Sequence, residues 1–294
     1  MKYPVITRLQ GGLGNQLYQY AIGRAVAAKL QRPLLLDKRT IEPEAPQRHY
    51  DLDVFNIEER FVAGHVAWAT RWVGSVRLGP TFQRLWLPAA NYRYLRDSQQ
   101  GFDASVFDRH KGTLVLMGYW QSYRYFEEIK AQLQDELSFA SPLDPVNRNL
   151  MDELRGCQSV AVHVRRGDYV SNPSFNESLG TCDASYYLRA SEYICEQHPD
   201  VSFYVFTDDP EWARKELKLA APFRVIDHNL GNADFEDMRL MSNCQHLIIA
   251  NSSFSWWSAW LANRPGKIVT APSTWFVDDA VPYDDRVPEG WVSL

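Results

Sequence analysis

The sequence has few cysteines, and none of them is placed for a metal site or a disulfide framework. Its 294 residues include only Cys157, Cys182, Cys195 and Cys244, with no C-x-x-C pair and no histidines at zinc-finger spacing. Scattered cysteines of this kind are typical of buried thiols in a reducing compartment. No stretch approaches the roughly 18 consecutive apolar residues of a membrane span, and the N-terminus has no apolar segment of signal-peptide length. We therefore expect a cytoplasmic protein without a membrane span.

An excess of positive charge is also missing. The chain has 31 Lys and Arg residues against 36 Asp and Glu, a formal net charge of -5, so no general surface for nucleic acid is expected. Hydrophobic residues make up 45% of the chain, which is typical of a globular protein, and the length fits two domains. The segment SPLDPVN at 141–147 contains two prolines and is the predicted linker. We expect an N-terminal domain over 1–145 and a C-terminal domain over 146–294.

Apolar runs and helical patterns alternate along most of the chain. In the first half, strands are expected at 5–9, 34–37 and 113–120, and helices at 15–30 and 123–139. In the second half, strands are expected at 159–164, 201–206, 223–227, 246–250 and 267–271, and helices at 184–197, 210–217, 233–244 and 253–263. Asp183 is suited to cap the helix at 184–197. Residues 42–110 give no clear pattern. The alternation predicts an α/β fold with parallel sheets and helices on both sheet faces.

Ligands of parallel sheets bind beyond the carboxyl ends of the strands, so polar residues that follow a strand are candidate site residues. Three such groups should converge on one sheet edge. They are His163, Arg165, Arg166, Gly167 and Asp168 around the end of the strand at 159–164; Thr207, Asp208 and Asp209 after 201–206; and Asn251, Ser252 and Ser253 after 246–250.

The chemistry of these groups points to a nucleotide. A salt bridge to Asp168 would account for one arginine, with Arg166 the better fit, and leave Arg165 with a guanidinium suited to phosphate. Asp209 precedes Pro210 and is the predicted N-cap of a helix, so Asp208 is left to accept hydrogen bonds from guanine or ribose. Ser252 and Ser253 open a helix, where free backbone N–H groups attract an anion, although plain helix capping is the alternative.

The turn QGGLGNQLYQY at 10–20 follows the first strand, but it is not a dinucleotide fingerprint, because Leu17 occupies the third glycine position. It is not a Walker sequence either, because no Lys-Ser/Thr pair follows. An NAD-dependent oxidoreductase is therefore a poor fit. Gly12 and Gly14 allow close backbone approach, while the amides of Asn15 and Gln16 suit sugar hydroxyls or a departing phosphate oxygen.

The segment DLD at 51–53 matches the D-x-D pattern of many metal-dependent sugar transferases. It does not follow a buried strand, and so short a pattern arises often by chance. We therefore expect it to be structural, and we expect no metal.

Five motifs, taken in order, resemble the α-1,2-fucosyltransferases of glycosyltransferase family 11: GGLGNQLYQYAIGRAVA, GYWQSYRYF, HVRRGDY, FTDD and NSSFSWWSAWLA. The resemblance implies a GT-B architecture, with two Rossmann-like domains facing a cleft, the acceptor on the N-terminal side and the GDP-sugar on the C-terminal domain. It further implies transfer of L-fucose from GDP-β-L-fucose to the 2-OH of a terminal galactose, with inversion and without a metal ion. Animal members carry a membrane anchor that this chain lacks, so the resemblance is to a bacterial type.

The resemblance also implies roles for individual residues. Arg165 would hold the diphosphate, His163 would lie against the nucleotide, and Asp208 would bind guanine. The donor pocket would be lined by Asn251, Ser252, Ser253 and Phe254, and Gly12, Gly14, Asn15 and Gln16 would face the cleft from the other domain. The resemblance does not identify the general base; Asp37, which ends a strand beside the glycine turn, is a candidate from the sequence, as are Asp168 and Glu177. The alternatives are a GT-B enzyme for another nucleotide sugar, such as GDP-mannose, and a non-catalytic GDP-sugar-binding module.

Overall fold

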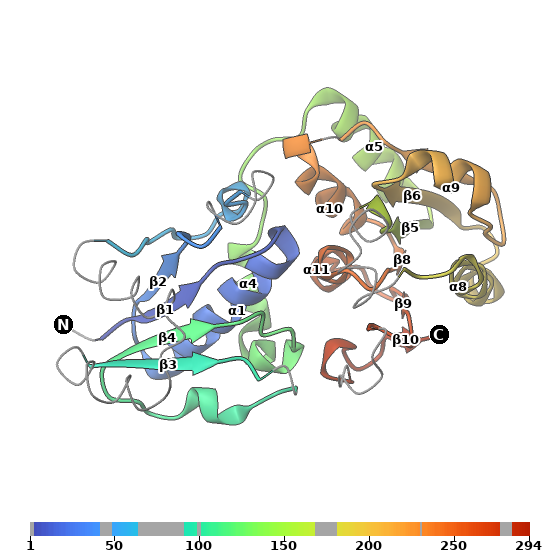
Figure 1. Ribbon diagram of the computed structural model, residues 1–294. Helices are drawn as coiled ribbons and strands as arrows, with labels where there is room; N and C mark the ends of the chain where they lie inside the picture. The colour runs from blue at the N-terminus through green and yellow to red at the C-terminus, as the bar shows by residue number, and fades with distance from the viewer. Residues whose placement is uncertain are drawn as a thin grey trace. The chain divides into compact units, whose positions relative to one another are not determined.

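The computed structural model describes residues 3–41, 49–63, 91–98, 101–167, 181–229, 231–276 and 284–294 (Figure 1). These divide into two compact units, residues 1–138 and 139–294, each with its own parallel sheet. The predicted domain boundary was at 145/146, a few residues further along the chain.

The first unit is built on a four-stranded sheet in the order β2-β1-β4-β3. Its strands are β1 (Val5–Arg8), β2 (Leu34–Asp37), β3 (Tyr92–Arg96) and β4 (Thr113–Met117), all parallel to their neighbours. Between the first two runs α1 (Leu13–Leu30), which packs on one face of the sheet. Two short 3-10 turns, Tyr123–Tyr125 and Glu127–Ile129, lead into α4 (Lys130–Glu136). Further 3-10 turns lie at Leu52–Val54 and Ala104–Phe107.

The helix α1 is buried nearly all round, which explains its apolar sequence. Its small residues let the sheet approach on one side, and its polar residues meet α4 on the other. Tyr20 Oη donates to Glu136 of α4 at 2.7 Å, and Arg24 Nε lies 2.9 Å from the same carboxylate. The helix ends at Gln31, which adopts φ 52° and ψ 50°, a left-handed C-cap conformation.

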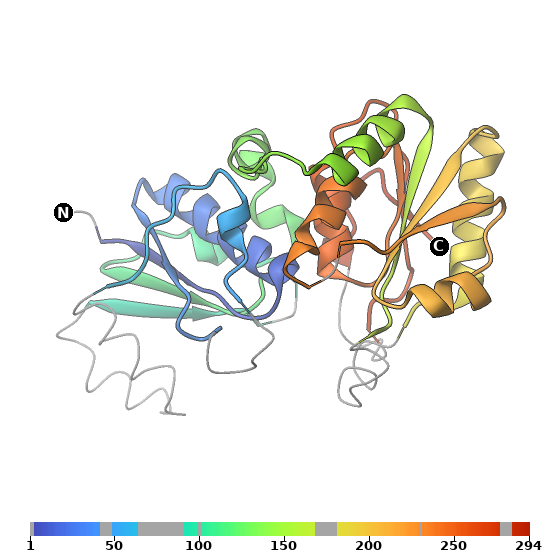
Figure 2. The same ribbon diagram turned by 90° about the horizontal axis from the view of Figure 1, so that it is seen from above.

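The second unit has a six-stranded sheet in the order β10-β9-β8-β5-β6-β7. Its strands are β5 (Ser159–Val164), β6 (Ser202–Thr207), β7 (Phe223–Ile226), β8 (His246–Ile248), β9 (Val269–Ala271) and β10 (Val292–Ser293). Its helices are α5 (Pro145–Gly156), α8 (Ala184–Gln197), α9 (Pro210–Glu216), α10 (Phe235–Met241) and α11 (Ser253–Leu261), with 3-10 turns at Gly231–Ala233 and Asp284–Arg286. Helices α8 and α9 cover one face of this sheet and α5, α10 and α11 cover the other (Figure 2).

The predicted caps of the second unit are confirmed. Asp183 accepts a hydrogen bond from Tyr186 N at the start of α8, and Asp209 accepts one from Trp212 N at the start of α9. Pro210 occupies the first turn of α9, where its missing N–H has no intrahelical partner to lose.

Three local expectations were wrong. The predicted linker contains the start of α5, where Asp144 accepts hydrogen bonds from Val146 N and Asn147 N, so its second proline begins a helix rather than extending a loop. The helix expected at 123–139 is α-helical only over 130–136. Strand β3 lies within 42–110, where no element was predicted, because its alternation of Tyr and Arg is only partly buried.

Candidate functional site

The register of β5 and β6 places Arg165 beside Asp208. Val164 and Thr207, the last residues of these strands, are partners across the parallel pair, so the residues that follow them leave the sheet side by side. Arg165 Nη1 lies 3.0 Å from Asp208 Oδ2. The other carboxylate oxygen accepts a hydrogen bond from the backbone N–H of Arg166 at 2.8 Å. The two predicted strand-end groups are thus brought together, but they bind one another.

Asp208, which we predicted to accept hydrogen bonds from guanine or ribose, therefore already has partners within the protein. Both of its oxygens are used, and a Cβ at Gly167 would lie only 2.9 Å from Oδ2, so glycine at 167 makes room for the carboxylate. The Asp208 carboxylate pairs with Arg165 and accepts from the Arg166 backbone, so it is well placed to orient the Arg165 guanidinium. Binding of guanine by Asp208 stays a prediction, and it would require the carboxylate to exchange these partners.

Arg166 turns away from Arg165, as strand alternation predicts. Its guanidinium lies over the ring of Trp212, 4.1 Å from the ring centroid, and its Nε lies 3.5 Å from Asp209. Asp209 therefore both caps α9 and pairs with Arg166. The partner predicted for Arg166, Asp168, lies outside the described residues, as does the candidate base Glu177.

His163 is buried at the end of β5 and contacts the first turn of α11. Its ring centroid is 5.7 Å from that of Phe254, with the two rings tilted by 33°. Burial, together with the charge of Arg165, lowers the pKa of His163 to about 3. The imidazole is therefore neutral at physiological pH. The contact joins the β5 and α11 groups, as predicted for one shared sheet edge.

Side-chain capping does not account for the polar residues before α11. Ser252 occupies the N-cap position, but its side chain makes no capping hydrogen bond. The Asn251 side chain is used elsewhere, because its Oδ1 accepts from Cys182 Sγ at 3.5 Å and its Nδ2 donates to Trp275 O at 3.3 Å. The start of α11 thus keeps the positive end of its dipole without a side-chain cap.

In the first unit, the amide of Gln16 is a structural group rather than a cleft-facing one. The side chain is fully buried. Its Nε2 donates to Gly11 O at 3.0 Å and His49 O at 2.7 Å, and its Oε1 accepts from Asp51 N at 3.0 Å. Asp51 Oδ2 lies 3.2 Å from the same Nε2. Both ends of the Gln16 amide are thus used within the protein, so neither is left to bind the donor, as had been predicted. Asp51 of the DLD segment makes a structural contact, as expected.

Gly12 and Asn15 keep the positions predicted for them at the carboxyl end of β1. Gly12 is the N-cap of α1, and its carbonyl accepts from the N–H groups of Asn15 and Gln16. Gly14 is buried in the first turn of the helix. The Asn15 side chain is half-buried and accepts one hydrogen bond, from Gln121 Nε2 at 2.8 Å.

Asp37 does not suit the role of general base. It is 1% exposed, and both of its oxygens are bound by Arg39, at 2.7 Å from Nε and 2.8 Å from Nη2. Arg8 Nε lies 3.7 Å away on β1. A buried carboxylate whose two oxygens are both bound by arginine is not accessible to a substrate hydroxyl. Asp37 does lie at the end of a buried strand, but its ion pairs with arginine make it a structural residue and not a base.

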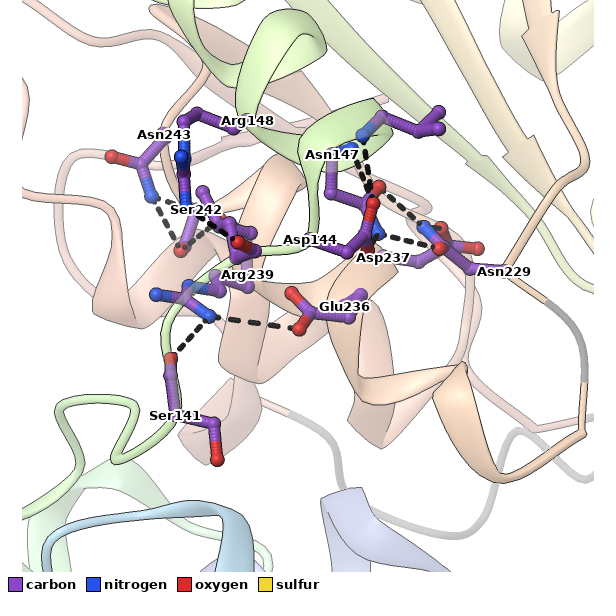
Figure 3. Close-up of polar contacts among 12 residues, drawn as sticks. Ser141, Asp144, Asn147, Arg148, Asn229, Glu236, Asp237, Arg239, Ser242 and Asn243 are labelled. Atoms are coloured by element: carbon purple, nitrogen blue, oxygen red, sulfur yellow. Dashed lines mark hydrogen bonds and ion pairs between the residues drawn. The ribbon is translucent and has the colours of Figure 1, made fainter.

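A polar network that the sequence did not predict lies at the end of β7 (Figure 3). Asn147 of α5 donates to Asn229 at 2.8 Å, and Asn229 donates to Asp237 of α10 at 2.8 Å. His228 Nε2 lies 2.8 Å from Asn147 Oδ1. Burial raises the pKa of Asp237 to about 7, with Asp234 and Glu236 adding to the effect. The sequence feature that could have revealed part of it is the Asp144–Pro145 pair. This pair marks the start of α5, the helix that carries Asn147, but we interpreted it as part of a linker.

The sequence is similar to that of a known enzyme family. The sequence profile of glycosyl transferase family 11 matches residues 80–294. The chain belongs to glycosyltransferase family 11. The resemblance seen in the five motifs is therefore confirmed, and the protein is a glycosyltransferase of the α-1,2-fucosyltransferase family.

The relatives extend over the full chain. It is 36% identical to the alpha-1,2-colitosyltransferase of Escherichia coli, over 99% of this chain and 98% of that protein. It is 26% identical to the galactoside 2-alpha-L-fucosyltransferase of Caenorhabditis elegans, over 99% of this chain and 79% of that one. The fucosyltransferase NodZ from Bradyrhizobium superposes with a TM-score of 0.53 at 16% identity, covering 88% of this chain and 92% of NodZ. The predicted GT-B fold is confirmed by this likeness.

A membrane span would need a helix of roughly 20 predominantly apolar residues. None of the helices in the described ranges is both long and apolar enough to cross a bilayer.

Proposed function

We propose that the protein transfers L-fucose from GDP-β-L-fucose to the 2-OH of a terminal galactose, with inversion and without a metal ion. The observation that carries the proposal is the pairing of Arg165 with Asp208 at the sheet edge where His163 contacts α11. This edge offers a fixed guanidinium beside the start of a helix that has no side-chain cap, which is a setting suited to a diphosphate.

The reaction needs stabilisation of the leaving group. The acceptor oxygen bonds to C1 of the fucosyl group as the bond from C1 to the β-phosphate oxygen breaks, the hydroxyl proton leaves to a base or water, and GDP departs. Negative charge develops on the β-phosphate, and preorganised donors aimed at such charge are a strong catalytic factor. Arg165 is our candidate for that donor, helped by the N–H groups at the start of α11. Because Asp37 is ion-paired, we name no protein base.

The identity of the relatives supports two donor sugars. The Caenorhabditis elegans relative is named for fucose and the Escherichia coli relative, at higher identity, for colitose. Colitose differs from fucose by one missing hydroxyl, so either donor would present the same diphosphate to the proposed site. Fucose is our first candidate, and colitose transfer is the second. GDP-binding relatives with this fold, such as NodZ soaked with GDP-fucose, support guanine as the base of the donor.

The decisive experiment is a transfer assay with GDP-fucose and lactose, with and without EDTA, and with the product linkage read by NMR. An α-1,2-linked product formed equally in both conditions supports the proposal. Loss of product with EDTA would overturn the metal-free mechanism. Transfer from GDP-colitose or GDP-mannose but not from GDP-fucose would replace the donor. Binding of GDP without transfer or donor hydrolysis would leave a non-catalytic module.

A further inference from the structure

The loop that follows β4 is fixed to the glycine turn that follows β1. Gln19 of α1 connects them, because its Nε2 donates to Gln10 O at 3.3 Å and to Gly118 O at 3.2 Å. Its Oε1 also accepts from Gln10 N at 2.9 Å. Gln19 is fully buried, so these bonds are protected from water. The two loops therefore form one rigid edge of the first unit's sheet.

The β4 loop itself is held in an unusual conformation. Trp120 has φ 56°, a left-handed value that a bulky residue rarely adopts. Asp97 holds it there, because Asp97 Oδ2 accepts from Trp120 N at 2.8 Å. Gly118 has φ 129°, and a Cβ at this position would lie 2.3 Å from the Asp97 side chain. Backbone strain of this kind persists only where neighbouring contacts over-determine it, and it is common at ligand sites. It sets the position of Gln121, the next residue.

Gln121 is thus placed to control the amide of Asn15. Its Nε2 donates to Asn15 Oδ1 at 2.8 Å, which leaves Asn15 Nδ2 as the other end of the amide. Within the part of the chain that the structure describes, Nδ2 has no hydrogen-bond partner. It lies over Gly11, where an added Cβ would approach it to 2.7 Å. The N–H donors of Asn15 are therefore turned away from Gln121 and lie above a residue without a side chain.

We propose that Gln121 is a positioning residue that selects the N–H end of the Asn15 amide for contact with a substrate oxygen. The inference rests on the proposed function for the identity of the substrate. A primary amide presents either two donors or one acceptor, and the two ends have the same shape. Only a fixed partner on one end can decide which is offered. The substrate oxygen is a hydroxyl or ring oxygen of the acceptor glycoside, or a phosphate oxygen of the donor.

The test exchanges the hydrogen-bonding sense of the partner. In Gln121→Glu the side chain only accepts, so Asn15 turns its Nδ2 toward it and presents Oδ1 to the substrate. In Gln121→Ala no partner remains, and the amide samples both orientations. We expect kcat/KM to fall on the order of ten-fold or more in Gln121→Glu, since a donor is replaced by an acceptor, and by only a few-fold in Gln121→Ala. Gln197→Glu, at an exposed position on α8, controls for the added charge.

Two results would overturn the inference. Equal losses in Gln121→Glu and Gln121→Ala, with matching falls in Tm, would mean that Gln121 only supports the loop. Wild-type kinetics in Gln121→Glu would mean that the Asn15 orientation is irrelevant. A rise in KM confined to lactose identifies the glycoside as the oxygen source, and one confined to GDP-fucose identifies the donor.

The orientation is also measurable without turnover, which separates this inference from the proposed function. Side-chain amide NMR signals of Asn15, assigned with Asn15→Ala, should show exchange-exposed protons in the wild type and protected ones in Gln121→Glu. Protected Asn15 protons in the wild type would overturn the inference. Absence of fucose transfer by the wild type would sink the proposed function, while the NMR result would still decide the role of Gln121.

Discussion

Arg165 Nη1 lies 3.0 Å from Asp208 Oδ2, one residue beyond the register pair Val164 and Thr207. The two side chains come from neighbouring parallel strands and are only partly exposed, at 30% and 25%. The contact thus fixes a cation at the carboxyl edge of the sheet, where the donor diphosphate is proposed to bind.

Loss of the Arg165 guanidinium should strongly impair transfer. We expect Arg165→Ala to reduce kcat on the order of 100-fold, because a donor to the developing β-phosphate charge is removed. Arg224→Ala is the matched control, since Arg224 makes an equally close ion pair with Glu153, at 3.0 Å, on the exposed edge strand β7. Exposed ion pairs contribute little, and Arg224 is no part of the proposed site, so Arg224→Ala should change kcat by less than about two-fold. Near-normal turnover of Arg165→Ala, measured with saturating GDP-fucose, would remove Arg165 from the mechanism.

Asp208→Asn distinguishes orientation of Arg165 from recognition of guanine. If Asp208 acts through Arg165, the variant should weaken GDP binding roughly ten-fold and leave binding of guanosine, which lacks phosphate, unchanged. If Asp208 binds the base, guanosine binding should weaken as well. Isothermal titration of both ligands to the wild type and the variant separates the two roles.

The buried neutral His163 should make the protein less stable in mild acid. Its folded pKa of about 3 lies below the ordinary value of 6.5, so its contribution to stability is fully present above pH 6.5. That contribution is lost as the pH falls towards 3, because the unfolded chain takes up the proton first. Between pH 6.5 and 5 the loss should be about 2 kcal/mol at most.

Replacement of His163 by leucine removes this titration. Urea unfolding of His163→Leu at pH 7 and at pH 5 should therefore give a smaller difference in unfolding free energy than in the wild type. An identical pH dependence in both proteins would mean that folding does not lower the pKa of His163.

Asp237 should destabilise the protein at neutral and higher pH. Burial raises its pKa from 3.8 to about 7, so the stability contributed by its protonated form is present below pH 3.8 and is lost as the pH rises through 7. Asp234 and Glu236 are the charged groups that act on this carboxyl group, and both raise its pKa, while Asn229 donates a hydrogen bond to it (Figure 3). Asp237→Asn keeps an oxygen for the Asn229 donor and carries no charge.

We expect Asp237→Asn to raise the unfolding free energy at pH 8 by about 1–3 kcal/mol and to have little effect at pH 4. Asp152→Asn, on the exposed face of α5, should change neither value. Chemical denaturation at both pH values measures this. A loss of stability at pH 8 would show that the ionised carboxylate is favoured by the network.

Gly23 should be the most sensitive glycine of α1. A Cβ at this position would lie 2.1 Å from Thr7 Oγ1 on β1 and 2.9 Å from Leu34 on β2. Gly23→Ala must push the helix off the sheet, and we expect a loss of about 1–3 kcal/mol of stability. Gly156→Ala, at the end of α5, would meet nothing within 4 Å and should be neutral or stabilising by up to about 1 kcal/mol. In thermal unfolding, the Tm of Gly23→Ala should fall by several degrees relative to the wild type, whereas the Tm of Gly156→Ala should stay the same or rise.

The local fold could be predicted from the sequence because it depends on local patterns. Apolar runs marked eight of the ten strands in the part of the chain that the structure describes, and Asp183, Asp209 and Pro210 marked the starts of two helices. The sequence also placed His163, Arg165 and the serines before α11 at strand ends, since polar residues after a buried strand must leave the sheet at its edge. Strands β3 and β10 were missed, because the partly buried tyrosines and arginines of β3 do not follow an apolar alternation and β10 has only two residues.

Tertiary structure alone decided which of these polar groups have protein partners. Asp208 and Gln16 looked available in the sequence, yet each is bound by residues from another strand or loop. Asp37 also looked available, but it is bound by Arg39, two residues further along the chain, and Arg8 of the neighbouring strand β1 lies 3.7 Å away. The network at Asn147 joins it to Asn229, 82 positions along the chain. Gln121 and Asn15, which are also hydrogen-bonded, are 106 positions apart. Periodicity and capping report on neighbours in the chain, whereas strand register and helix packing bring distant side chains within hydrogen-bonding distance. The sequence alone therefore determined where the polar groups lie, and the tertiary structure decided which of them already bind one another.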